Sequence, residues 1–227
     1  MSMLRAEKLK KNFGNVEALK NIEIEAEEGE IVGLLGPNGA GKSTTIKILT
    51  GQIERDSGTV SVLGIDPQNK PVELRERLGI LPEREDPPSF LTGSEYLEFI
   101  SDIRDTEIDK DYWIEKLNLE GKMDSLTRDL SKGERQKLMI IQAFFHQPEL
   151  VFIDEPLINL DPVIQERVKQ IFEDFRDEGG TIVVSTHVVA LAQEICDKVF
   201  FIREGETVEE IEDVENLKQR FLEEYDT

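Results

Sequence analysis

The residues best suited to chemistry in this 227-residue chain form one glycine-rich stretch, Gly36-Pro37-Asn38-Gly39-Ala40-Gly41-Lys42-Ser43-Thr44. An apolar run precedes it and a helical pattern follows, so G-x-x-x-x-G-K-[ST] lies in the strand–loop–helix context of a phosphate-binding P-loop. Its glycines let backbone N–H groups surround an anion. A glycine-rich turn that only links a strand to a helix is the alternative, but the flanking elements favour nucleotide binding.

Two side chains of this loop have a predicted chemical task. Lys42 is expected to reach the β- and γ-phosphates, and the Ser43 hydroxyl to ligate Mg²⁺. The helix that begins near Gly41 adds its positive dipole end and its unpaired N–H groups. The other predicted nucleotide-binding residues of the loop are Gly36, Asn38, Gly39, Gly41 and Thr44.

Two adjacent carboxylates, Asp154 and Glu155, end an apolar run at residues 150–153. A buried strand can place Asp154 at the edge of a sheet, where it can hold Mg²⁺ directly or through water. Glu155 then faces the γ-phosphate side and can polarise the attacking water. Two acids that merely cap a strand end are common, but beside a P-loop they favour a hydrolytic site.

A third motif opens a helix with Ser131, Gly133 and Glu134. Serine followed three residues later by glutamate is a capping box, so one interpretation is simply the start of a helix. The same geometry allows a functional interpretation, because a serine hydroxyl and a glycine N–H at a helix N-terminus can receive a γ-phosphate.

The segments that must position these residues differ in their hydrophobic pattern along the chain. Residues 4–9 and 22–27 are expected to be strands, and the strict alternation of residues 22–27 indicates an antiparallel sheet with one wet face. The runs at residues 150–153, 181–184 and 199–202 are continuously apolar. Such runs fit a mostly parallel sheet covered by helices on both faces, so the predicted fold class is α/β.

The middle of the chain lacks comparable strands and carries helical patterns instead. Helices are expected around residues 94–103, 109–117 and 130–145, between the breakers Asp86-Pro87-Pro88 and Gln147-Pro148. We expect one domain with three parts: a nucleotide-binding core with an antiparallel β subdomain at residues 1–83 and 148–213, an inserted helical subdomain at residues 84–147, and a short acidic helix or tail at residues 214–227.

With these motifs together, nearly the whole chain resembles the ATP-binding-cassette (ABC) ATPases. The resemblance identifies residues 36–44 with the Walker A loop and residues 150–155 with Walker B and its catalytic glutamate. It implies an α/β P-loop NTPase core of the ABC type, with ATP and Mg²⁺ as ligands. It also implies that Ser131 and Gly133, which match the signature motif, bind the γ-phosphate held by the opposite subunit.

Three further matches follow from the same resemblance. Asn159-Leu160-Asp161 is similar to the D-loop that crosses the dimer interface. His187, after Ser185-Thr186, is similar to the switch histidine that supports hydrolysis. Phe13 stands where an aromatic residue stacks on adenine. A core aromatic at position 13 and an ordinary helix-terminal residue at position 187 remain the alternatives.

The chain departs from the family pattern at two motifs. The signature usually reads Leu-Ser-Gly-Gly-Gln, whereas here Lys132 and Glu134 replace a glycine and the glutamine; the two changes cancel in net charge and preserve the helix cap, so we expect function to survive with an altered contact in trans. Glu83 replaces the usual glutamine, but a carboxylate can still ligate Mg²⁺, which makes Ser43, Asp154 and Glu83 the predicted metal ligands. Both variants resemble the branch whose ATPases serve ABC-2-type exporters.

Composition limits the surroundings in which the chain works. The formal net charge of −21 opposes nucleic acid and anionic lipid as general partners; adaptation to a salty cytoplasm and plain solubility both explain it.

The single cysteine, Cys196, is expected to be a buried packing residue, and His146 structural or solvated. No apolar run approaches the ~20 residues that span a bilayer. We therefore expect a protein that is soluble by itself and cytoplasmic, at the membrane only through a partner.

These expectations combine into one leading hypothesis and two alternatives. The leading hypothesis is an ATPase subunit that dimerises with a second copy, or a homologous ATPase, around two Mg·ATP and drives a separate transmembrane permease, as an exporter. A cleft near residues 83–89 is expected to contact that permease. The alternatives are an ABC-type ATPase that acts on ribosomes or DNA, and a nucleotide-regulated binding module with little turnover.

Overall fold

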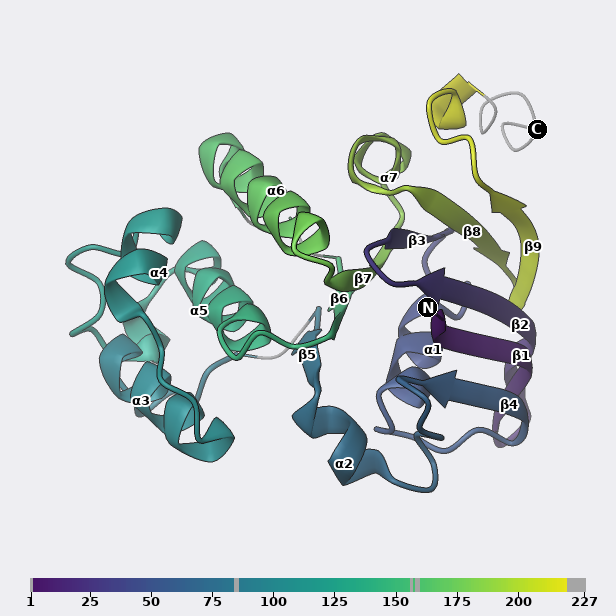
Figure 1. The fold of residues 1–227 in the computed structure, drawn as a ribbon, viewed down its shortest axis with the longest axis horizontal. Helices are drawn as coiled ribbons and strands as arrows, with labels where there is room; N and C mark the ends of the chain where they lie inside the picture. Colours follow the sequence, from purple (N-terminus) through teal and green to yellow (C-terminus); the bar gives the residue numbers. More distant parts are fainter. Residues whose placement is uncertain (1, 84–85, 156, 158–159, 220–227) are drawn as a thin grey trace.

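The computed structural model describes residues 2–83, 86–155, 157 and 160–219. Within these residues nine strands form one sheet in the order β4-β1-β2-β9-β8-β3-β7-β6-β5 (Figure 1). The strands are β1 (Ser2–Phe13), β2 (Val16–Glu27), β3 (Ile31–Leu35), β4 (Ser57–Val62), β5 (Leu78–Leu81), β6 (Leu150–Asp154), β7 (Thr181–Thr186), β8 (Lys198–Arg203) and β9 (Glu206–Ile211).

Helices cover both faces of the central strands. In chain order they are α1 (Lys42–Leu49), α2 (Pro71–Glu76), α3 (Gly93–Arg104), α4 (Lys110–Leu117), the short 3₁₀ helix η1 (Thr127–Asp129), α5 (Lys132–Phe144), α6 (Pro162–Asp177) and α7 (Val189–Ile195). Helices α3, α4 and α5 lie together at one end of the molecule, and the antiparallel strands β1, β2 and β4 lie at the other (Figure 1).

The parallel strands have apolar side chains on both faces, as their continuous runs predict. In β3, Ile31 and Leu35 belong to the core that contains residues of α3 to α7, whereas Val32 and Leu34 belong to the core with α1, α2 and the antiparallel strands. All five residues of β3 and of β6 are buried. Because successive side chains of a strand point to opposite faces, only a sheet covered on both sides buries such a run. The predicted α/β fold class is confirmed.

The first two strands form an antiparallel hairpin, in keeping with the predicted antiparallel sheet. Phe13 pairs with Val16 across a turn in which Gly14 has a φ of 59°, a conformation that glycine adopts without strain. Residues 22–27 of β2 alternate strictly between buried and exposed. One face of this hairpin therefore packs on the core while the other faces solvent.

The three predicted helices of the middle segment are present with small shifts of their ends. The capping side chain of α3 is Thr92, that of α4 is Asp109, and that of α5 is Ser131. Each accepts a hydrogen bond from a backbone N–H of the first helical turn, so the helix starts one residue after its cap. The predicted start of the third helix at residue 130 was therefore two residues too early.

Sequence reasoning missed the edge strand β5 and the helix α2 before it. β5 pairs in parallel with β6, with Leu81 opposite Ile153. A four-residue run followed by Pro82 shows too few positions to reveal a period. The strand matters because it carries Glu83 to the end of the sheet where β6 carries Asp154.

The remaining expectations concern single residues and the end of the chain. Cys196 is buried against Gly33, and burial raises the pKa of its thiol well above the ordinary value, which fits the predicted packing role. His146 is partly buried, and its Nε2 lies 3.1 Å from the carbonyl oxygen of Leu78, which is a structural contact. Of the predicted acidic helix or tail at residues 214–227, residues 217–219 are helical, and residues 220–227 lie outside the described residues. Among the described residues, no helix combines the length and apolar character that crossing a membrane requires.

Candidate nucleotide site

The glycine-rich loop connects β3 to α1 by a path that only glycine allows at two positions. A Cβ atom at Gly36 would lie 2.0 Å from the carbonyl oxygen of Ile202. Gly41, directly before the first residue of α1, has a φ of 110°, and a Cβ there would lie 2.6 Å from Leu19. The loop therefore packs closely against the backbones of β8 and β2. Its opposite side faces the cavity.

A cavity of about 450 Å³ opens above the loop and brings most of the predicted site residues together. Its volume suits a small-molecule ligand. The residues that line it are Ala18, Asn38, Gly39, Gly41, Lys42, Ser43, Thr44, Glu83, Asp154, Glu155 and His187.

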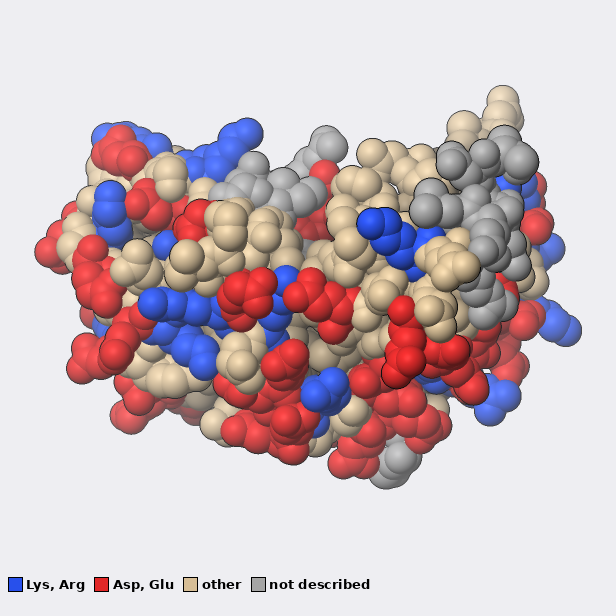
Figure 2. Space-filling model, turned by 90° about the horizontal axis from the view of Figure 1, so that it is seen from above, with Lys and Arg blue, Asp and Glu red and all other residues tan. Residues whose placement is uncertain are grey.

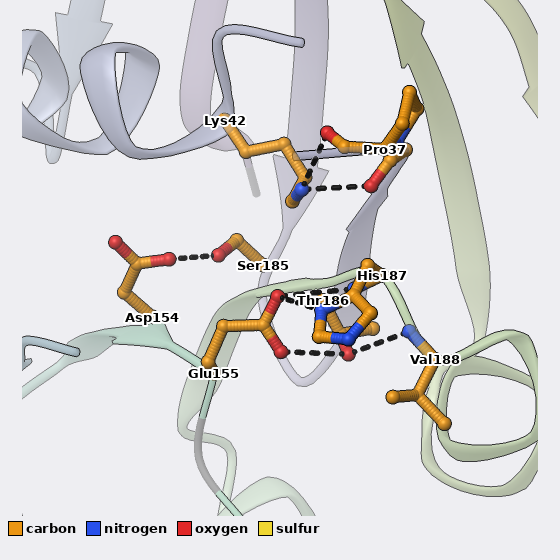
Figure 3. A network of polar contacts seen from close by, with 9 residues as sticks. Pro37, Lys42, Asp154, Glu155, Ser185, Thr186, His187 and Val188 are labelled. Atoms are coloured by element: carbon orange, nitrogen blue, oxygen red, sulfur yellow. Dashed lines mark hydrogen bonds and ion pairs between the residues drawn. The ribbon is translucent and has the colours of Figure 1, made fainter. Parts of the chain in front are cut away.

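The Lys42 ammonium is bonded to its own loop. Its Nζ donates to the carbonyl oxygens of Gly36 at 2.7 Å and Pro37 at 3.1 Å (Figure 3). The side chain is only 6% exposed. Burial lowers the pKa of Lys42, and the negative charges of Glu155, Asp154 and Glu83 partly oppose that effect. The lysine is thus a desolvated cation in a cavity that three carboxylates also line.

The two carboxylates at the end of β6 have different partners, both from the end of β7. Asp154 accepts a hydrogen bond from the Ser185 hydroxyl (Figure 3). Glu155 accepts from the Thr186 hydroxyl at 3.2 Å through Oε2 and from the His187 backbone N–H at 3.1 Å through Oε1. Each carboxylate is therefore fixed in direction by hydroxyl or amide donors before any ligand binds.

His187 is turned toward Glu155. Its Nδ1 lies 2.7 Å from Glu155 Oε1. An ionised carboxylate can only accept, so Nδ1 carries the hydrogen, and the other ring nitrogen, Nε2, is the one left for a ligand. Glu155 itself has a φ of 54°, in the left-handed region that residues with a side chain disfavour.

Five predicted residues do not line this cavity. Gly36 forms the base of the loop, and Phe13 is half exposed at the β1–β2 turn with Lys11 Nζ 5.4 Å from its ring centroid. Ser131 and Gly133 lie at the start of α5. Asp161 caps α6 by accepting from the N–H groups of Val163 and Ile164 at 3.1 Å. Of the predicted D-loop, Asn159 lies outside the described residues.

The capping box at Ser131 is fully formed. Ser131 Oγ accepts from the Glu134 N–H at 3.2 Å, and Glu134 accepts from the Ser131 N–H at 2.7 Å. Lys122 lies 3.0 Å from Glu134, and these contacts, the Ser131 N–H first, lower the pKa of the Glu134 carboxyl. Lys132 is exposed. The charges of Lys132 and Glu134, the two departures from the family signature, sum to zero. They do not neutralise each other locally, because Glu134 is paired with Lys122 whereas Lys132 faces solvent.

The residues at the loop fit a magnesium ion that is held mainly by a substrate. No group of three or more His, Cys, Asp and Glu side chains in the described part of the chain is arranged to hold a metal. Mg²⁺ commonly takes only one or two protein carboxylates together with phosphate oxygens and water. The Ser43 hydroxyl and the Asp154 and Glu83 carboxylates at one cavity supply such a donor set.

Some residues of the site were not assigned a role from sequence. Ser185 and Thr186 orient Asp154 and Glu155, and their position directly before His187 at the end of an apolar strand was the available signal. Ala18 lines the cavity from β2. Nothing in its local sequence marks it, because its place depends on how β2 passes the loop.

A buried parallel sheet whose first core strand ends in a P-loop, with two acids at the end of another strand, defines a P-loop nucleotide-binding protein. The family described as ABC transporter matches residues 19–158. An uncharacterized ABC transporter ATP-binding protein of Methanocaldococcus jannaschii is 36% identical over 93% of this chain and 79% of its own length. The lipopolysaccharide export system ATP-binding protein LptB of Haemophilus influenzae is 31% identical over 98% of both chains.

A solved structure described as the ATP binding subunit of an ABC transporter superposes with a TM-score of 0.87 at 29% identity, over 97% of this chain and 94% of the other. The chain belongs to the ABC transporter family and is an ATPase of the ATP-binding-cassette type.

Proposed function

We propose that the protein hydrolyses ATP as a dimer of two cassettes, drives a separate membrane permease, and works in export. The observation that carries this proposal is a divided site. Lys42, Glu155 and His187 share one cavity, whereas Ser131 and Gly133 do not line it. We infer that a phosphate held by the loop of one copy meets the Ser131 of a second copy.

The hydrogen bonds of Glu155 suggest where the attacking water binds. Oε1 already accepts two bonds, both from His187, whereas Oε2 accepts one, from Thr186. A carboxylate oxygen has two lone-pair sites, so Oε2 retains one. We assign that site to the water, with the carboxylate of Glu155 as the base that polarises it and receives its proton.

The remaining residues act on the phosphates. The water oxygen forms a bond to the γ-phosphorus while the bond to the bridging oxygen breaks, and ADP leaves with the electron pair. Lys42 exchanges its loop carbonyls for phosphate oxygens and offsets their charge. His187 Nε2 is assigned to the γ-phosphate side. Ser43, Asp154 and Glu83 would hold a magnesium ion, which would supply charge neutralisation for the phosphates.

The proposed dimer also gives roles to residues outside the cavity. Ser131 and Gly133 present a hydroxyl and an N–H at the start of α5, where the helix dipole favours an anion. Asp161 is proposed to lie at the interface, and Phe13 to stack on the adenine from the β1–β2 turn. The division into a core and a helical subdomain at residues 84–147 belongs to the same proposal.

A groove on the helical side supports the permease partner. It encloses about 310 Å³ and is lined by α3, α5 and the segment of Asp86 and Pro88. Phe99 and Ile103 on its rim are 47% and 65% exposed, and Phe90 nearby is 73% exposed. Exposed apolar side chains that gather at a groove mark an interaction site. We assign the groove to an apolar segment of the permease, through which the protein reaches the membrane.

The relatives and the surface charge favour this partner over the alternatives. The named relative in Haemophilus influenzae belongs to an export system, which supports export. Acidic side chains gather over the lower half of the face in Figure 2, with basic groups between and above them. Long-range repulsion therefore opposes an ATPase that acts on DNA or ribosomal RNA.

The variant Glu155→Gln tests the proposal. We expect turnover to fall by about 10²–10⁴-fold, the range for loss of a general base, while ATP binding persists and ATP-bound dimers accumulate. Light scattering with Mg·ATP measures the dimers, and phosphate release measures turnover. Glu17→Gln, on the exposed side of β2, is the matched control. Normal turnover in Glu155→Gln would refute the assignment of the base, and a wild type that stays monomeric at every ATP concentration would refute the dimer.

A further inference from the structure

A second cavity lies at the opposite end of the parallel strands from the nucleotide cavity. It encloses about 890 Å³ between α4, the end of α5 and the C-terminal half of α6. Its lining includes Glu149, directly before β6, and Gly180, directly before β7, whereas Asp154 at the other end of β6 lines the nucleotide cavity. The strand from Glu149 to Asp154 spans roughly 16 Å. The two cavities share no lining residue, so the second one is a separate site.

The charged side chains that line the second cavity are all acidic. Within the described residues, no lysine or arginine lines it. The carboxylates are those of Glu28, Glu107, Asp109, Glu149, Asp174 and Glu178. Arg77 pairs with Glu149 at 2.6 Å and Lys116 with Asp174 at 3.2 Å. The described part of the chain offers no ion-pair partner to the other three glutamates, nor any group of acids arranged to hold a metal ion. The cavity therefore favours an extended organic cation.

Aromatic rings form most of the apolar lining. They belong to Tyr112, Trp113, Phe144, Phe145 and Phe175. An ammonium group of the chain already lies between a ring and a carboxylate of this wall, because Lys116 Nζ is 6.0 Å from the Tyr112 ring centroid and 3.2 Å from Asp174 Oδ2. Ring faces attract cations, and a guanidinium group suits such a wall best because it stacks on rings and pairs with carboxylates through two hydrogen bonds.

One polar group of the same wall lacks a partner. Trp113 is only 8% exposed, and its indole nitrogen can donate but not accept. The described residues provide no acceptor for it, yet their one sealed polar side-chain atom without a partner is His146 Nδ1. The Trp113 N–H is therefore open to the cavity that its ring lines. Since a buried tryptophan usually has an acceptor, a ligand of this cavity is expected to supply one.

We propose that the second cavity binds an arginine-containing peptide segment of a partner protein. Guanidinium groups of the segment pair with the unpaired glutamates and stack on Tyr112, while one of its backbone carbonyl oxygens accepts from the Trp113 N–H. A peptide satisfies all three features, whereas a protonated polyamine offers cations but no acceptor. The inference goes beyond the proposed function and does not depend on it, because the nucleotide site lies at the other end of the sheet.

The fluorescence of Trp113, the only tryptophan of the chain, reports occupancy of this cavity. The probe is the synthetic peptide acetyl-Arg-Gly-Arg-Gly-amide. We expect a saturable change in emission, in the presence or absence of ATP. The same peptide with citrulline, which keeps the shape of arginine without its charge, should not bind. A lysine version should bind about two- to fivefold more weakly, because an ammonium group neither stacks on rings nor pairs through a planar fork.

The variant Trp113→Phe keeps an aromatic ring and removes the N–H. Its affinity for the fluorescein-labelled arginine peptide, measured by anisotropy, should fall about two- to tenfold, as for loss of one hydrogen bond. Its affinity for spermine, measured by calorimetry, should not change, because protonated spermine cannot accept that bond. An equal fall for both ligands would overturn the assigned contact.

The net charge of −21 attracts any cationic peptide, so the acidic lining is tested against a charge-matched control. One triple variant removes the unpaired carboxylates of the cavity, namely Glu28→Gln, Glu107→Gln and Glu178→Gln. The control removes three exposed carboxylates that do not line it, namely Glu17→Gln, Glu54→Gln and Glu206→Gln. In about 0.15 M salt the first should lose about tenfold in peptide affinity, as for a few exposed ion pairs, and the control less than about twofold, because distant charges are screened.

The outcomes separate a built site from general attraction. Equal losses in the two triple variants would overturn the proposal, since net charge alone would then hold the peptide. Unchanged Trp113 emission at saturating peptide, or equal affinity for the lysine version, would also overturn it. Binding of a fluorescent ATP analogue by every variant confirms that each is folded, so failure of this proposal leaves the proposed function standing. A loss confined to the cavity variants supports the peptide site.

Discussion

Replacement of His146 by glutamine should remove a pH-sensitive part of the stability of the fold. The Nε2–H of His146 faces the carbonyl oxygen of Leu78 at 3.1 Å, and the same carbonyl accepts from Arg104 at 3.3 Å. His146 Nδ1 is buried and has no partner among the described residues. A second proton on this ring would therefore lie on an atom without an acceptor, close to a guanidinium.

The direction of the effect follows from the pKa. Burial first, and the charge of Arg104 second, lower the pKa of His146 from 6.5 to about 4. The unfolded chain therefore takes up the proton before the folded chain does, and stability is lost as the pH falls from 6.5 to about 4, then levels off. The whole displacement corresponds to about 3 kcal/mol. Because the ring is only partly buried, solvent screening leaves about 1–1.5 kcal/mol.

Urea unfolding at about pH 7.5 and about pH 4.5 measures this contribution for the wild type and His146→Gln. The many carboxylates of the chain also titrate, but they do so in both proteins, so the difference between the two pH dependences isolates His146. We expect the wild type to lose about 1–1.5 kcal/mol more than the variant over this range. Identical pH dependences would refute the view that the folded protein holds the imidazole neutral.

Three further predictions concern the loop and the signature helix. Lys42→Ala should weaken binding of a fluorescent ATP analogue at least about tenfold, as expected for loss of a charge-assisted contact; unchanged affinity would exclude the predicted role. Gly36→Ala should lower the free energy of unfolding by about 2 kcal/mol or more in thermal unfolding, because the new Cβ would lie 2.0 Å from the Ile202 carbonyl oxygen. Gly14→Ala, which has open space around it, should lower it by only about 1 kcal/mol. Glu134→Gln should keep the helix cap and stability within about 0.5 kcal/mol, whereas Glu134→Ala should lose about 1 kcal/mol; equal losses would show that the cap contributes nothing.

The sequence predicted those parts of the fold that depend on local patterns. The P-loop, the acid pair after an apolar run and the capping box each combine residue type with short spacing, so they could be recognised without knowing the tertiary structure. The alternation of residues 22–27 and the continuous apolar runs assigned the antiparallel and parallel strands correctly. Both hydrophobic patterns indicate which faces of a strand are buried.

What could not be predicted depends on contacts between distant segments. The strand β5 is four residues long and is identified by its pairing with β6 rather than by its own period. The hydrogen bonds of Ser185 and Thr186 to Asp154 and Glu155 join residues 31 positions apart in the chain. The ion pair between Lys122 and Glu134 could not be predicted either. The sequence therefore predicted only the summed charge of Lys132 and Glu134.

The left-handed backbone of Glu155 places stability and turnover in conflict at one residue. A φ of 54° is unfavourable for a residue with a Cβ atom by about 1–2 kcal/mol, and glycine would adopt it freely. Selection for a sturdier fold alone would therefore drive this position toward glycine. Glutamate is kept at this position only if selection acts on its carboxylate. In descendants of this protein, the residue at position 155 would therefore indicate whether hydrolysis is still under selection.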